Sequence, residues 1–185
     1  FFGVDQVEAV TERVIVLAGE LGLEQVMGDT IYGALDRHLP GAVKRAGTLF
    51  DMARDAYGKV GDAYGVITLH LIETRHFAQT GQDPDKIVEA GLRALEEAGD
   101  QLSADQLAFV HLQFGELLLN FDERFDDAIS HLERAMHLYD RVGDIEHLQV
   151  VGAILREVYR KQGDFARYRW IRERFRAVDE AGPGI

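Results

Sequence analysis

The apolar residues of this chain recur every three or four positions, which is the spacing of one face of an α-helix. One clear stripe runs through Phe125, Ala128, Ile129, Leu132, Ala135, Met136 and Tyr139. A second follows at Leu148, Val151, Gly152, Leu155, Val158 and Tyr159. Because the same spacing extends over nearly the whole chain, the pattern predicts an all-α protein.

The breaks in the pattern predict nine helices, arranged as one leading helix and four pairs in a single repeat domain of residues 1–185. The leading helix covers 4–21, and the pairs cover about 24–60, 62–98, 103–142 and 144–181. Residues 42–60 are expected to form one uninterrupted helix. Asp83 and Pro84 suit the first turn of the helix that runs to residue 98, and Ser103 suits the N-cap of the next helix.

Four Gly-Asp pairs separate predicted helices: Gly61-Asp62, Gly99-Asp100, Gly143-Asp144 and Gly163-Asp164. Glycine readily takes the left-handed conformation that ends a helix, and aspartate accepts hydrogen bonds from the free N–H groups that begin one. From Gly61 to Gly99 is 38 residues, and from Gly99 to Gly143 is 44. A two-helix period near forty residues is typical of a helical solenoid. The alternative is a globular helical bundle with coincidental spacing.

Several segments resemble the tetratricopeptide repeat (TPR). They are 41–46 with Phe50, Ala53 and Tyr57; Phe125, Ala128, Leu132 and Ala135; Leu155, Tyr159 and 163–165; and Gly115, which matches the small residue of the first helix. The resemblance covers nearly the whole chain, although its repeats exceed the family's 34 residues. In this respect the chain is similar to the longer repeats found in bacterial regulators and signalling proteins. The resemblance implies a right-handed α-α superhelix of antiparallel helix pairs.

In this family the first helix of each pair lines a groove that holds a peptide or a partner helix. The resemblance places the following residues near that surface: Tyr32, Arg75, Gln79, Gln113, Glu116, Asn120, Glu157 and Arg160. Amide side chains can pair with a peptide backbone, and arginine can grip a carboxylate with two hydrogen bonds. The resemblance therefore implies a protein-binding or peptide-binding scaffold, or a sensing module, in a bacterial regulatory or signalling protein. A polar face without a ligand, in an oligomerisation or spacer domain, is the alternative.

The last predicted helix is basic in an acidic chain. Residues 156–176 hold eight basic and three acidic residues, a net charge of +5, whereas the whole chain carries −12. Trp170 lies off the apolar stripe of this helix, which consists of Tyr168, Ile171, Phe175 and Val178. Since Trp and Arg are common interface anchors, we hypothesise that Arg167, Trp170 and Arg174 form an assembly interface with another subunit or further sequence. The alternatives are a solvated terminal helix and nucleic-acid binding, which the acidic balance disfavours.

The sequence holds no recognisable catalytic, cofactor or metal motif. It has seven histidines and no cysteine, and the histidine pairs considered lack the i, i+4 spacing of a helical zinc site. His76, three residues after Glu73, is expected to form a surface pair with it. We therefore expect no enzyme, cofactor or metal, with an unrecognised helical enzyme as the remaining alternative. No apolar run suits a membrane span, so we expect a cytoplasmic protein, and the missing initiator Met suggests part of a longer gene product.

Overall fold

The chain is all-α throughout the part that the structure describes. The computed structural model describes residues 4–80, 85–121 and 124–176, and these form ten α-helices and one short 3-10 helix with no strand. Contacts within the chain divide it into two compact units, residues 1–102 and residues 103–185. That the whole chain forms a single continuous repeat domain stays a prediction.

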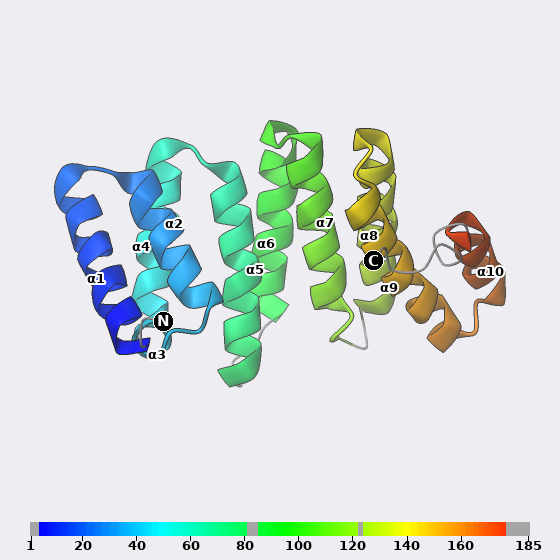
Figure 1. The fold of residues 1–185 in the computed structure, drawn as a ribbon, viewed down its shortest axis with the longest axis horizontal. Coiled ribbons are helices and arrows are strands. Elements are labelled where there is room, and N and C mark those ends of the chain that lie inside the picture. The colour runs from blue at the N-terminus through cyan, green and yellow to red at the C-terminus, as the bar shows by residue number, and fades with distance from the viewer. Residues whose placement is uncertain (1–3, 81–84, 122–123, 177–185) are drawn as a thin grey trace. The chain divides into compact units, whose positions relative to one another are not determined.

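The first unit contains six α-helices. They are α1 (Val4–Leu21), α2 (Glu24–Asp36), α3 (Pro40–Lys44), α4 (Ala46–Val60), α5 (Ala63–Thr80) and α6 (Asp85–Ala98), followed by the 3-10 helix η1 (Gly99–Gln101). The long helices pack in chain order, α1 on α2, α2 on α4, α4 on α5 and α5 on α6, and they alternate in direction (Figure 1). Fully buried Ile31 of α2 and Phe50 of α4 belong to the core of this unit.

The predicted helix over residues 42–60 is interrupted, so the described residues hold ten α-helices where the sequence predicts nine. The chain leaves helical geometry at Arg45, where φ is −116° and ψ is 17°. Two carboxylates of α1 hold this segment: Glu8 accepts a hydrogen bond from the N–H of Gly41 at 2.7 Å, and Glu12 pairs with Arg45. The spacing of apolar residues does not reveal such polar contacts between helices. The prediction of one uninterrupted helix over residues 42–60 is therefore wrong.

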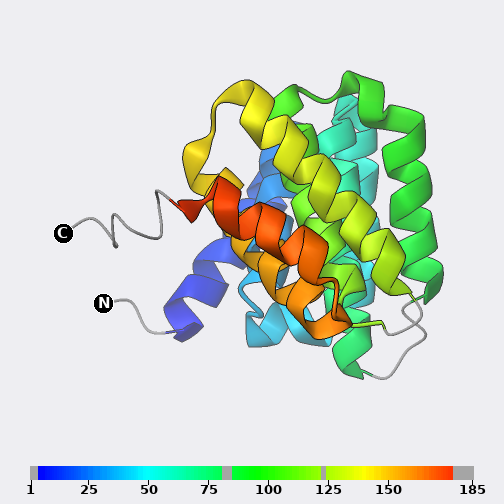
Figure 2. The ribbon, with the colours of Figure 1, turned by 90° about the vertical axis from the view of Figure 1, so that its right-hand side faces the viewer.

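The second unit contains four helices, α7 (Ala104–Leu118), α8 (Phe125–Val142), α9 (Ile145–Gln162) and α10 (Phe165–Arg174). Helix α8 packs against both α7 and α9, and α10 packs against α9, as Figure 2 shows in the foreground. Ser103 begins α7 as predicted, in a reciprocal capping box. Its Oγ accepts from the N–H of Gln106 at 3.4 Å, and its N–H donates to the Gln106 Oε1 at 3.0 Å.

A glycine allows the close approach of α7 and α8. A Cβ added to Gly115 would lie 2.6 Å from Cγ of Leu132 and 3.2 Å from the carbonyl oxygen of Ala128. Both partners are completely buried. Real Cβ atoms do not approach a neighbour as closely as 2.6 Å, so any side chain at this position would push the two helices apart. Gly115 is the residue that resembles the small residue in the first helix of the repeat.

Three of the four Gly-Asp pairs form the same joint between consecutive helices, which we call the Tyr-Gly-Asp joint. Its members are Tyr57, Gly61 and Asp62; Tyr139, Gly143 and Asp144; and Tyr159, Gly163 and Asp164. In each joint the glycine has a positive φ, between 69° and 75°. The aspartate N–H donates to the tyrosine carbonyl at 2.9–3.0 Å, and its side chain accepts from the N–H three residues later at 2.9–3.0 Å. One helix is thereby ended and the next begun by the same two residues.

The fourth pair, Gly99-Asp100, does not form this joint, and the prediction there is wrong. Gly99 begins η1 in place of a left-handed turn, and α7 takes its N-cap from Ser103. Because Ser103 supplies a complete capping box three residues later, the N-terminus of α7 does not need Asp100. The predicted capping role of Asp83 and Pro84 lies outside the described residues.

Candidate functional site

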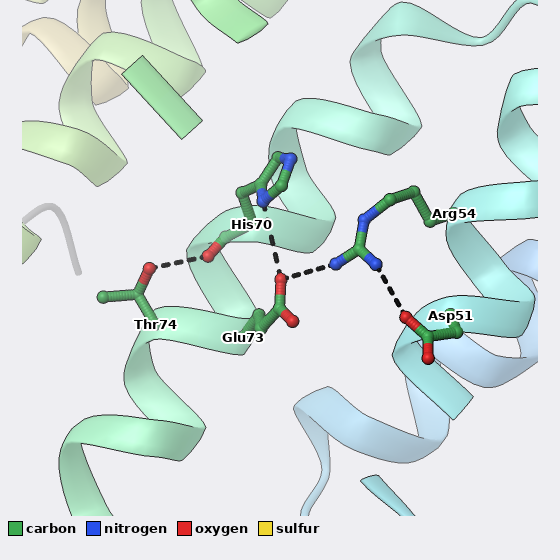
Figure 3. Close-up of polar contacts among 5 residues, drawn as sticks. All are labelled: Asp51, Arg54, His70, Glu73 and Thr74. Carbon is green, nitrogen blue, oxygen red and sulfur yellow. Dashed lines mark hydrogen bonds and ion pairs between the residues drawn. The ribbon is translucent and has the colours of Figure 1, made fainter. Parts of the chain in front are cut away.

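A partly buried ion-pair cluster joins α4 to α5 in the first unit. Arg54 of α4 donates one hydrogen bond to Glu73 Oε2 at 2.7 Å and another to Asp51 Oδ1 at 2.9 Å (Figure 3). His70 Nδ1 lies 3.5 Å from the same Glu73 oxygen. The side chains of Glu73 and His70 are only 14% and 13% exposed, whereas Asp51 is 78% exposed. The guanidinium therefore connects a buried carboxylate with one at the surface.

The charges around Glu73 make it a structural anion rather than a proton donor. Burial by itself would raise the pKa of Glu73, but His70 and Arg54 outweigh that effect and hold the pKa below its ordinary value of 4.5. Arg54 is the firmer partner, because His70 Nδ1 makes no hydrogen bond within the described residues. As an ionised carboxylate paired with Arg54, Glu73 stabilises the packing of α5 against α4.

The expected surface pair of Glu73 with His76 is wrong. His76 is 8% exposed and its ring centroid lies 5.9 Å from that of Phe50. Glu73 is partnered instead by His70, which precedes it by three residues, and by Arg54 from the neighbouring helix. The i, i+3 spacing is the same in both directions along the helix, so sequence alone could not tell which histidine shares the face of Glu73.

The side chains at the Tyr-Gly-Asp joints are held by hydrogen bonds and stacking. The Tyr159 hydroxyl donates to Glu133 Oε1 at 2.5 Å, and the Arg167 guanidinium lies 4.7 Å from the Tyr159 ring centroid. At the preceding joint, the rings of Tyr139 and His147 stack with centroids 5.1 Å apart. Burial raises the pKa of Tyr159 above its ordinary range, and the hydrogen bond to Glu133 adds to the rise. The phenol therefore stays protonated and acts as a donor.

Two histidines from different helices meet in the second unit. Nδ1 of His111, on α7, lies 2.9 Å from Nδ1 of His131, on α8, and the ring centroids are 5.0 Å apart. His131 also packs against Phe114, with ring centroids 5.7 Å apart. The pair borders an open surface hollow lined by His111, Ser130, His131, Glu133, Arg134 and His137. Histidine spacing within a single helix gives no signal for this pair, because its two members lie on different helices.

The predicted groove residues of the first unit are partly brought together. Tyr32 of α2 and Arg75 of α5 are half-buried and near enough for their charges to interact. Burial raises the pKa of Tyr32 above 10.0, the carboxylate of Asp36 adds to this, and Arg75 opposes it. The side chain of Gln79 lies outside the described residues.

The predicted groove residues of the second unit mostly engage one another. Gln113 donates to Glu116 Oε2 at 3.1 Å, and Arg160 donates two hydrogen bonds to the carboxylate of Glu157 at 2.9 and 2.7 Å. The side-chain N–H of Asn120 donates to the carbonyls of residues 116 and 117, at 3.3 and 3.1 Å, and so caps the C-terminal end of α7. Glu116, Glu157 and Arg160 remain exposed to solvent. Whether these residues contact a ligand stays a prediction.

The three predicted assembly residues all lie on the surface of α10. Trp170 is 51% exposed, and the Arg174 guanidinium lies 5.5 Å from its ring centroid. Arg174 also pairs with Asp140 of α8 at 2.8 Å, and Arg167 pairs with Asp164 at 2.6 Å. The arginines thus already have partners within the chain, whereas the indole is left largely uncovered. The inward stripe includes Ile171, which is 1% exposed, while Val178 lies outside the described residues.

Within the described residues no group of three or more His, Cys, Asp or Glu side chains converges as a metal cage would require. Over the same part of the chain no helix is both long and apolar enough to cross a membrane.

Comparison with known proteins reveals similarity at the level of fold. No protein-family model matches the chain, and no curated protein matches its sequence. Among solved structures, the crystal structure of BtubC (BKLC) from P. vanneervenii is similar, with a TM-score of 0.78 and 16% sequence identity. The match covers 98% of this chain and 75% of that one. At this level of identity the likeness concerns the fold alone.

Proposed function

We propose that this chain is a TPR-like helical repeat that binds a protein or peptide and catalyses no reaction. Its setting would be a bacterial regulatory or signalling protein, in the cytoplasm. In this proposal the helix pairs form a right-handed superhelix, and the exposed polar faces of α7 and α9 contact the partner. The proposal rests on sequence resemblance together with the local geometry of the helix pairs.

The recurring Tyr-Gly-Asp joint is the observation that carries the proposal. Three such joints have the same glycine conformation and the same two aspartate hydrogen bonds within 0.1 Å. A repeated joint between consecutive helices is expected when a chain is built from similar helical units. The close approach of α7 and α8 at Gly115 adds support.

The exposed charges of the second unit offer a direct test of binding. Immobilised protein would be used to capture partners from a lysate of the source organism, in parallel with the variants Glu116→Arg and Arg160→Glu. Both side chains are exposed, so neither change should unfold the chain. Asn120→Ala is a poorer probe, because Asn120 closes the end of α7.

A matched control for Arg160→Glu is Arg141→Glu, which makes the same charge change on exposed Arg141 of α8, outside the predicted groove. The proposal expects one partner to be retained by the native protein and by Arg141→Glu but lost by the groove variants. Equal capture by all four proteins would refute the assignment of the groove.

Self-assembly through α10 is the second candidate function. It is favoured by Trp170, which is 51% exposed, and by Phe165, which is 63% exposed. Burying two large aromatic side chains from solvent would stabilise an interface by a few kcal/mol, at about 25 cal/mol per Å² of apolar surface. Sedimentation velocity over a range of concentrations would detect assembly of the native chain and its loss in Trp170→Ala. A native chain that stays monomeric throughout would rule this function out.

A further inference from the structure

The Nδ1 atoms of His111 and His131 lie close enough together to bind one metal ion. The two Nδ1 atoms, one from α7 and one from α8, are 2.9 Å apart. Two imidazole nitrogens that bind one zinc ion lie about 2.0–2.1 Å from it. When the two bonds meet at a right angle, as in octahedral or square-planar coordination, the nitrogens are about 2.9 Å apart. The pair therefore has the separation of the right-angle case, whereas a tetrahedral ion would need the nitrogens about 3.3 Å apart.

We propose that His111 and His131 together bind a divalent late transition-metal ion, such as Zn²⁺ or Ni²⁺, through their Nδ1 atoms. In the absence of metal, one Nδ1–H donates a hydrogen bond to the other Nδ1. Metal binding requires the donor ring to change tautomer, its proton moving through solvent from Nδ1 to Nε2 with no net release, and it replaces the hydrogen bond by two metal–nitrogen bonds. The ion then joins α7 to α8, and water molecules complete its coordination shell.

The protonation states favour binding at neutral pH. Burial lowers the pKa of His111 to about 4, and the neighbouring His131 and the charge of Arg134 add to this. Burial also lowers the pKa of His131, although the carboxylate of Asp127 opposes it. Both rings are consequently neutral near pH 7, and a metal ion need not compete with a second proton at either ring.

The surroundings leave room for water but impose an electrostatic cost. His111 and His131 both line an open hollow with a volume of about 460 Å³, so water can reach an ion held between them. Arg134 lines the same hollow and repels a cation, while Asp127 attracts it. With two protein ligands and this nearby positive charge, we expect moderate affinity rather than that of a closed structural zinc site.

Calorimetric titration of the untagged, full chain with Zn²⁺ or Ni²⁺ alone, near pH 7, tests the proposal. The decisive variant is His131→Phe, which removes the ligand while keeping an aromatic ring against Phe114. Its control is His137→Phe, because His137 lines the same hollow but lies outside the pair. We expect about one ion per chain, a loss of at least about tenfold in affinity in His131→Phe, and no change in the control.

Two further measurements keep the test decisive if a variant folds poorly. In the native protein, Ni²⁺ should broaden the ring resonances of His111 and His131 before those of other histidines. Arg134→Gln should bind the ion more tightly, because it removes a repelling charge from the hollow. Absence of binding up to about 1 mM metal, equal affinity in His131→Phe, or first broadening at a different histidine would each overturn the proposal.

Discussion

Gly115→Ala should destabilise the second unit, although alanine favours helices more than glycine does. The added Cβ would meet Cγ of Leu132 at 2.6 Å and the carbonyl of Ala128 at 3.2 Å. Overpacking of this kind costs about 1–3 kcal/mol, whereas the gain in helix propensity is about 1 kcal/mol. We expect a net loss of about 1 kcal/mol in the free energy of unfolding.

Gly33→Ala is the matched control, because a Cβ at Gly33 in α2 would meet nothing within 4 Å. It should stabilise the first unit by up to about 1 kcal/mol. Urea unfolding followed by circular dichroism measures both variants, and Trp170 fluorescence reports separately on the second unit. If Gly115→Ala stabilises the chain as Gly33→Ala does, the reasoning about close helix approach is wrong.

A double-mutant cycle identifies the clash itself. Leu132→Ala alone should cost about 2–5 kcal/mol, because Leu132 is fully buried. In the Gly115→Ala background the same change also relieves the contact between the two side chains. The double variant should therefore be more stable than the sum of the single changes predicts, by about 1 kcal/mol. If the stability changes of the two single variants simply add, the effect of Gly115→Ala does not come from its contact with Leu132.

Three further predictions concern the polar contacts between helices. The pKa of Glu73 is lowered in the folded chain, so its contribution to stability is present above its ordinary value of 4.5 and is lost as the pH falls through the folded value. In urea unfolding over pH 3–7, Glu73→Gln should flatten this acid-side decline. Asp144→Ala removes the side chain that caps α9 and should cost about 1 kcal/mol in the same assay. Tyr57→Phe removes the hydrogen bond of 3.0 Å to Asp29 and should cost about 0.5–1.5 kcal/mol; no loss would mean that the bond contributes nothing net.

Sequence could predict the helices well because their signals are local. The apolar stripe beginning at Phe125 and the glycine at 143 give α8 its predicted bounds, Phe125–Val142. Gly143 has a φ of 75°, as a helix-ending glycine should, and Ser103 caps α7. The helix predicted over 42–60 is interrupted where a contact distant in sequence intervenes, between Glu12 and Arg45.

The polar clusters could not be predicted, because each depends on how two helices pack. His111 and His131 are twenty residues apart, and Arg54 and Glu73 are nineteen apart, on different helices. Their meeting requires the register between helices, which apolar spacing does not specify. The family resemblance places Asn120 near a ligand surface, and in the structure its side-chain N–H also donates to carbonyls at the end of its own helix.

Hydrogen-exchange mass spectrometry of the chain with a captured partner tests the proposed binding function most directly. Exchange would be compared between the free and bound states, with the Arg160→Glu variant as a control for specific binding. The account predicts that the partner slows exchange in α7 and α9, around exposed Glu116 and Arg160, and that the variant loses this protection. Protection confined to α10 around Trp170, in the native chain alone at high concentration, would contradict it and establish self-assembly in its place.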